Sequence, residues 1–410
     1  MDKKRRHLRR NPTQMKSEEV DTMPKAYLKY NREKRVEQGH PWIFRSDIDR
    51  VEKTAEPGDV MDLHAAKGKF LGRAYYNPAS MITLRMLTRE DEPIDRDFFY
   101  RRVQRAYDFR KSFCDINSCR LIYGESDFLP ALIVDKFADI CVMQSLALGI
   151  DRYKDILCDA IMDITGCRGI YGRDDVPVRE LEGLTQQKGF LRGQFDTNVL
   201  MEENGIKFMV DVANGQKTGF FLDQKENRAS LAPIVRDKEV LDCFTHTGSF
   251  ALHAAKFGAA HVTGVDISED ACVLARRNAA LNDLDNVEFV AENAFDLLRR
   301  SYDEKKLYDV IILDPPAFTK TRSAVEGALR GYKEINLRAM KMLPKGGFLV
   351  TCSCSQHVSP AAFTEMLLGA ARDAHRQIRI VEARTQGKDH PVLLAAPETQ
   401  YLKFFVLQVF

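Results

Sequence analysis

Residues 239–266, EVLDCFTHTGSFALHAAKFGAAHVTGVD, decide how the rest of the chain is interpreted. Apolar runs at 240–244 and 261–265 predict two buried parallel strands, and the apolar stripe over 249–257 predicts the helix between them. The first strand contains Asp242 and leads to a turn with Gly248, where backbone N–H groups can approach a ligand. Asp266 follows Asp242 by 24 positions, close to the roughly 20 expected before a ribose-binding acid. The unit is therefore predicted to hold an adenosine-containing cofactor.

The glycine pattern of the loop favours one cofactor over others. A dinucleotide loop needs G-x-G-x-x-G, and a P-loop needs G-x-x-x-x-G-K-[ST]; this loop has neither. A single glycine with a leading Asp242 suits a ligand without phosphate, whose ammonium group meets a carboxylate while its ribose meets Asp266. We predict S-adenosylmethionine, against the alternative of an ordinary turn that binds nothing.

Composition indicates a globular chain with two or three domains. It has 410 residues, of which 44% are hydrophobic and 29% charged, and a net charge of only +2. Nucleic-acid affinity would therefore depend on local clusters of Lys and Arg. Nine cysteines without a CxxC pair predict reduced thiols and no metal site. Without a signal peptide or a membrane-length apolar stretch, we expect a cytoplasmic protein that does not contact membranes.

The order of strand and helix patterns predicts an α/β fold in four segments. The basic N-terminus is either a solvated tail or an arm that touches RNA. Strands alternate with helices toward the C-terminus, which predicts a doubly wound, mostly parallel sheet. The segments are a basic tail at 1–24, a β-rich domain at 25–92, a small central α/β domain at 93–200 and a cofactor domain at 201–410.

The β-rich domain contains candidate RNA-binding residues. Trp42, the single tryptophan, is either a buried aromatic plug or a surface on which RNA bases stack, and we favour the plug. Basic residues around it either line a phosphate-facing surface or form a solvated face; those selected are Lys34, Arg35, Arg45 and Arg73.

Three strand ends are expected to meet at one crevice: residues 242–248, 314–318 and 352–355. In the segment 314–318, two prolines after Asp314 make a rigid extended turn that can orient the carboxylate. Such a turn after a strand is typical of enzymes that methylate a nucleobase. The third contains Cys354. Carbon-5 of a pyrimidine accepts a methyl group only after a nucleophile adds at carbon-6, and a thiolate can do this. We predict Cys354 as this nucleophile, with the more deeply placed Cys352 as its rival, against a purely structural role.

Taken together, the segments HPWIF, NGQKTGFFLDQ, DCFTHTGSFA, DPPAF, GYKEIN and TCSCS resemble the bacterial large-subunit ribosomal RNA cytosine-C5 methyltransferases with an N-terminal PUA domain. The resemblance implies a Rossmann-like methyltransferase domain, a PUA-like RNA-binding domain and a ribosomal RNA substrate. It implies Cys354 as nucleophile and Asp314 as the motif acid. The cofactor contacts predicted from it and from neighbouring positions are Phe220, Asp242, Phe244, Thr245, Gly248, Asp266, Ile267, Asn293, Ala294 and Asp314.

The chain departs from the family pattern at two positions, and two other functions stay open. Asn293 stands where such enzymes often have Asp, and Ala317 stands where a related branch has a second cysteine for product release. One alternative is an RNA guanine or adenine N-methyltransferase, which would use Asp314 but not Cys354. The other is a non-catalytic RNA-binding ribosome-assembly factor. A homodimer is possible.

Overall fold

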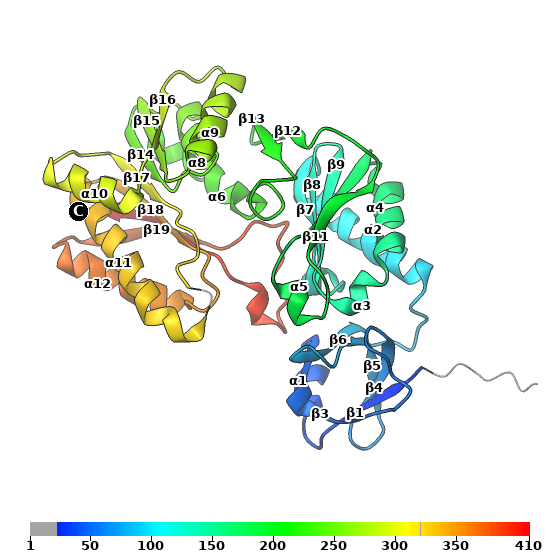
Figure 1. The fold of residues 1–410 in the computed structure, drawn as a ribbon. Coiled ribbons are helices and arrows are strands. Elements are labelled where there is room, and N and C mark those ends of the chain that lie inside the picture. The colour runs from blue at the N-terminus through cyan, green and yellow to red at the C-terminus, as the bar shows by residue number, and fades with distance from the viewer. Residues whose placement is uncertain (1–22, 320) are drawn as a thin grey trace, which may run out of the picture.

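The computed structural model describes residues 23–319 and 321–410. The basic run predicted as a tail or RNA arm lies outside the described residues. The chain forms three parts that follow one another in an arc, with the N-terminal sheet at the bottom, the central part on the right and the large C-terminal part on the left (Figure 1). Among the described residues, no helix combines the length and apolar character needed to cross a membrane.

The N-terminal part is a six-stranded sheet with strand order β2-β6-β5-β4-β1-β3, accompanied by the short helix α1. Alternating apolar residues such as Leu28, Leu63 and Leu84 point to one side of the strands and form its core. The elements are β1 Lys25–Leu28, α1 Glu33–Glu37, β2 Trp42–Phe44, β3 Ile48–Val51, β4 Val60–His64, β5 Phe70–Tyr76 and β6 Ile82–Thr88.

The central part packs two long helices against a five-stranded sheet with order β11-β10-β9-β8-β7. Helix α2 begins where the Asp95 carboxylate accepts a hydrogen bond from Phe98 N at 3.0 Å, and its apolar stripe, including Phe99 and Val103, is buried. The elements are α2 Arg96–Phe113, β7 Ser118–Tyr123, β8 Leu132–Phe137, β9 Ile140–Ser145, α3 Leu148–Asp151, α4 Lys154–Thr165, β10 Gly169–Asp174, α5 Val178–Leu181 and β11 Gln187–Arg192.

A two-stranded hairpin, β12 Asn198–Glu203 and β13 Ile206–Asp211, connects the central part to the C-terminal part. The sequence predicts a strand at 207–212, and the structure pairs it with β12 rather than with the large sheet. Two short helices, α6 Lys225–Ala229 and α7 Ala232–Val235, lead from the hairpin into that sheet.

The C-terminal part is a seven-stranded sheet with order β16-β15-β14-β17-β18-β20-β19. Strands β14 to β18 pair in parallel, and β20 is antiparallel to β18. Chain order reverses between β14 and β17, which is where ligands bind in doubly wound sheets. The elements are β14 Glu239–Cys243, α8 Ser249–Lys256, β15 His261–Asp266, α9 Glu269–Leu281, β16 Val287–Ala291, α10 Ala294–Asp303, β17 Val310–Leu313, α11 Val325–Met342, β18 Phe348–Ser353, α12 Pro360–Asp373, β19 Ile378–Arg384 and β20 Lys403–Val409.

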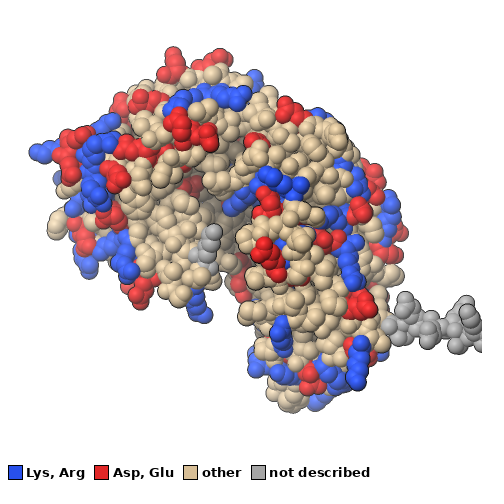
Figure 2. All heavy atoms as spheres, viewed as in Figure 1, with Lys and Arg blue, Asp and Glu red and all other residues tan. Residues whose placement is uncertain are grey.

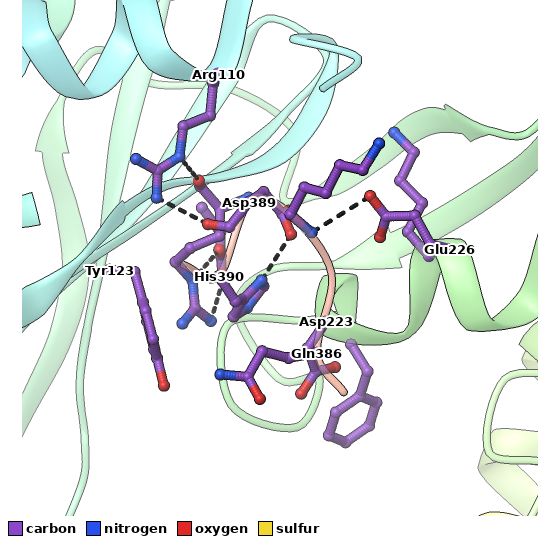
Figure 3. A network of polar contacts seen from close by, with 12 residues as sticks. Arg110, Tyr123, Asp223, Glu226, Gln386, Asp389 and His390 are labelled. Carbon is purple, nitrogen blue, oxygen red and sulfur yellow. Dashed lines mark hydrogen bonds and ion pairs between the residues drawn. The ribbon is translucent and has the colours of Figure 1, made fainter. Parts of the chain in front are cut away.

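The segment between β19 and β20, residues 385–402, reaches back to the central part, and we call it the strap (Figure 1). Arg110 of α2 donates to Asp389 O at 2.7 Å, and Arg120 N of β7 donates to the Asp389 carboxylate at 2.8 Å (Figure 3). Arg110 also makes a bidentate pair with Asp127 and is fully buried. The strap therefore fixes the C-terminal part to the central part through buried polar groups.

Candidate active site

A cavity of about 320 Å³ lies at the carboxyl ends of the parallel strands. It brings together the loop after β14, the end of β15, the turn after β17 and the residue after β18, as the sequence pattern predicts. Eight of the predicted site residues line it: Phe244, Thr245, Asp266, Ile267, Asn293, Ala294, Asp314 and Cys354.

The loop after β14 has an unusual backbone. Phe244, His246 and Gly248 have φ values of 65°, 51° and 85°, and two of these are not glycine. A Cβ at Gly248 would lie 2.9 Å from the ring of Phe289, so only glycine fits. The Asp266 carboxylate accepts a hydrogen bond from His246 N at 2.9 Å. The strained loop is thereby fixed to the end of the neighbouring strand.

Asp242, Phe220 and Gly248 are close to the cavity but do not line it. Asp242 is fully buried and accepts hydrogen bonds from Thr245 Oγ1 at 2.5 Å and Ala251 N at 3.0 Å. Burial raises the pKa of Asp242 to about 7, against these hydrogen bonds. In this geometry Asp242 shapes the loop and the start of α8 from behind the cavity wall.

One end of the cavity is apolar and suits a flat heterocycle. Ile267 is 74% exposed although its side chain is large and apolar, and the rings of Phe244 and Phe295 lie 6.1 Å apart beside it. Asn293 caps α10, because its side-chain oxygen accepts from Phe295 N at 2.9 Å. That oxygen is therefore already engaged in the protein.

The opposite end is polar and contains residues to which the sequence analysis gives no individual role, although three of them lie in the quoted segment NGQKTGFFLDQ. Lys217, Asp223, Gln224 and Arg228 line it. Asp223 is 5% exposed, Tyr401 donates to one of its oxygens, and the other oxygen has no partner among the described residues. Although burial opposes it, Lys217 and His390 hold the pKa of Asp223 at about 2. An ionised, unpaired carboxylate oxygen beside cations suits the ammonium and carboxylate groups of an amino-acid tail.

Cys354 and Asp314 face the same cavity. Cys354 Sγ lies 3.9 Å from Pro315 O, and burial together with Asp314 raises the pKa of the thiol to about 11. Asp314 accepts a hydrogen bond from Gln224 Nε2 at 3.0 Å, and burial together with Asp223 raises its pKa to about 6. Cys352 is fully buried and does not line the cavity.

The turn that carries Cys354 is held from two sides. Tyr332 of α11 and Ser355 share a hydrogen bond of 2.9 Å between their hydroxyl groups. Lys403 Nζ donates to Ser355 O at 2.7 Å and to Tyr401 O at 2.8 Å, and burial lowers the pKa of Lys403 to about 8. The GYKEIN pattern marks Tyr332, whereas no sequence pattern marks Lys403.

The predicted RNA-binding residues of the N-terminal part differ in their surroundings. Arg73 is committed to Asp62 and Asp91, and Arg35 pairs with Glu398 of the strap. Lys34 and Arg45 are exposed, although Arg45 also donates to Pro78 O. Trp42 is partly buried, and its Nε1 donates to Glu125 of the central part at 2.8 Å. The surface is hollowed between the N-terminal and C-terminal parts (Figure 2).

Comparisons with known proteins agree with this architecture. The family of PUA-like domains matches residues 26–89, and a family of S-adenosylmethionine-dependent methyltransferases matches residues 188–404. The chain is 41% identical to ribosomal RNA large subunit methyltransferase I of Aliivibrio fischeri and 44% identical to that of Shewanella denitrificans, with 93% of this chain and 98% of each relative covered. A Streptococcus mutans structure described as an S-adenosylmethionine-dependent methyltransferase superposes with a TM-score of 0.80 at 22% identity, covering 94% of this chain and all of that one.

Proposed function

We propose the following reaction on the premise that this chain belongs to the S-adenosylmethionine-dependent methyltransferase family that contains ribosomal RNA large subunit methyltransferase I. The chain methylates carbon-5 of a cytosine in large-subunit ribosomal RNA, and Cys354 forms the transient covalent bond. The observation that carries the proposal is the placement of a partly accessible thiol and a carboxyl group, Asp314, in the cofactor cavity while Cys352 is sealed from it.

S-adenosylmethionine is the cofactor, and the cavity fits it. Phe244, Ile267 and Phe295 would hold its adenine, Asp266 would hold its ribose, and the unpaired oxygen of Asp223 would meet its ammonium group. When bound, the cofactor supplies the methyl group. The sequence analysis assigns the ammonium contact to Asp242, and we prefer Asp223 because it lines the cavity and Asp242 does not.

The thiol needs a proton acceptor, because its pKa of about 11 keeps it protonated at neutral pH. Asp314, with a pKa of about 6, is mostly ionised there and can take that proton. As the sulfur bonds to carbon-6, Asp314 returns the proton to N3 of the ring, which leaves carbon-5 electron-rich. After methyl transfer, the carbon-5 proton is lost to a base, and the S–C6 bond breaks as the C5–C6 double bond re-forms. The proton on N3 returns through Asp314 to the departing sulfur, which leaves neutral 5-methylcytosine and the Cys354 thiol.

The test is nucleoside mass spectrometry of ribosomal RNA from cells with and without this protein. We expect one 5-methylcytidine to disappear from large-subunit RNA and to return with the wild-type gene but not with Cys354→Ala. RNA that carries 5-fluorocytosine at that position should form a stable adduct at Cys354, since fluorine is not lost as a proton. Loss of a methylated guanine or adenine, with Cys354→Ala still active, would show that the enzyme methylates an exocyclic or ring nitrogen instead.

A further inference from the structure

A second cavity, of about 350 Å³, adjoins the first at Cys354. Its walls come from all three parts of the molecule: Trp42 from β2, Tyr123 and Glu125 from the end of β7 and the turn after it, and Tyr401 from the strap. Cys354 lines both cavities. We call the second one the aromatic cavity. The Cys354 thiol therefore lies between the cofactor cavity and a space whose walls come from the N-terminal part, the central part and the strap.

The chemistry of the aromatic cavity suits a neutral, planar group with an amino substituent. Trp42, Tyr123 and Tyr401 contribute three aromatic side chains to the cavity wall, and aromatic side chains are the groups on which nucleobases stack. Glu125 Oε1 accepts from Trp42 Nε1 at 2.8 Å and lies 3.6 Å from Arg85 Nη1, while no hydrogen bond engages its Oε2 within residues 23–319 and 321–410. Glu398 is a second acidic residue in the wall, so a phosphate group is disfavoured.

The walls are fixed rather than loosely packed. Tyr123 OH donates to Thr399 O at 2.9 Å, and Tyr401 OH donates to Asp223. Arg110 and Asp389 join the central part to the strap, and Figure 3 shows Tyr123 and Asp223 on either side of this contact. A rigid aromatic slot loses little conformational entropy when a flat ring enters it.

We infer that the aromatic cavity binds an unstacked nucleobase of the RNA substrate, with Glu125 Oε2 accepting a hydrogen bond from its exocyclic amine. Carboxylates accept in this way from N4 of cytosine. The inference deepens the proposed function and rests on RNA being the substrate. It makes Glu125 a specificity residue, because uracil has a carbonyl oxygen at the same position and would meet a carboxylate oxygen.

The single tryptophan makes the test direct, because its emission reports on the ring in the cavity wall. Full-length protein is titrated with a short single-stranded RNA that has one cytidine among uridines, and with an all-uridine RNA. RNA binding is followed separately by the anisotropy of a label on the RNA end. We expect the cytidine RNA to change Trp42 emission and to bind roughly tenfold more tightly than the all-uridine RNA.

Two variants separate recognition from folding. Glu125→Gln keeps an oxygen for Trp42 Nε1 but turns an amide donor toward the base, so the preference for cytidine should vanish. Tyr123→Ala should weaken binding roughly tenfold or more through lost stacking, and Tyr123→Phe should lose much less. Unchanged binding of S-adenosylhomocysteine and an unchanged melting temperature show that each variant is folded.

The inference is overturned if bound RNA leaves Trp42 emission unchanged, or if Glu125→Gln retains the cytidine preference. Its failure can be told apart from failure of the proposed function. Absence of 5-methylcytidine in the mass spectra removes the carbon-5 reaction, whereas a tryptophan response to cytidine RNA would still support the cavity assignment. If the cytidine RNA does not change the anisotropy at all, the cavity assignment is overturned, while the mass spectra decide the carbon-5 reaction separately.

Discussion

The cofactor cavity and the aromatic cavity share Cys354 but are built in different ways. The strand ends of the cofactor cavity belong to one sheet, where successive parallel strands place them at the same edge. The walls of the aromatic cavity come from residues near positions 42, 123 and 401, which only tertiary packing brings together. One site is fixed by secondary structure and the other by contacts between parts of the chain.

This difference explains what could be predicted from the sequence. The fold class, the strand-helix-strand unit and the meeting of three strand ends follow from periodicity, glycine placement and the carboxyl-edge rule, and the family resemblance adds cavity residues such as Phe244 and Asn293. Asp223 and Lys403 could not be assigned, because their roles depend on which neighbours surround them. The ammonium contact predicted for Asp242 stays a prediction, because an acid at a strand end can face the ligand or accept from its own loop, and Asp242 accepts from Thr245 and Ala251. The role of Cys354 was predicted from its place beyond a strand end and from the chemistry of carbon-5, and the family resemblance implies the same role.

The largest expected effect is the loss of the shared thiol. Cys354→Ala should lower methylation by more than about 10⁴-fold, because no nucleophile remains to activate the ring. Turnover is measured with tritiated methyl donor and RNA. Cys352→Ala is the matched control and should stay within severalfold of wild type. Equal loss of methylation in both variants would mean that the two cysteines act through packing. Cys354 would then not be the nucleophile.

Asp314→Asn should lower the rate of the methyl-transfer step by about 10²- to 10⁴-fold, because the proton relay between thiol and N3 is lost. In the wild type, only the ionised carboxyl accepts the thiol proton, so the single-turnover rate should rise with pH through about 6. The variant should lose this dependence. Asp296→Asn, whose side chain is 66% exposed, should retain it. A wild-type rate that is flat from pH 5 to 8 would contradict the assigned role.

Removal of Arg110, which joins the central part to the strap, should weaken ligand binding in the two cavities unequally. Arg110→Ala leaves Asp127 buried and unpaired, which should lower the free energy of unfolding by about 3 to 5 kcal/mol. We expect weaker RNA binding but nearly unchanged binding of S-adenosylhomocysteine, both by calorimetry. Arg101→Ala removes an exposed pair with Glu92 and should cost less than about 1 kcal/mol. If Arg110→Ala weakens cofactor binding as much as RNA binding, the shape of both cavities depends on the contact between the central part and the strap.

The smallest effect concerns the N-terminal part. Lys34 is exposed and free to meet a phosphate group, so Lys34→Ala should reduce the slope of log affinity against log salt by about 1. Arg73→Ala should leave that slope unchanged, because Arg73 is already paired with Asp62 and Asp91. A fall in the slope for Arg73→Ala alone would reverse this distinction between the two residues.

The position of β20 has a consequence for when activity can begin. Lys403, its first residue, donates a hydrogen bond to the carbonyl group of Ser355, and β20 pairs with β18 along that edge. During synthesis, the loop after β14 emerges from the ribosome long before β20 does. The sulfur of a growing chain therefore stays unpositioned until Lys403 has been made and β20 has paired with β18, long after the loop that carries Gly248 has emerged.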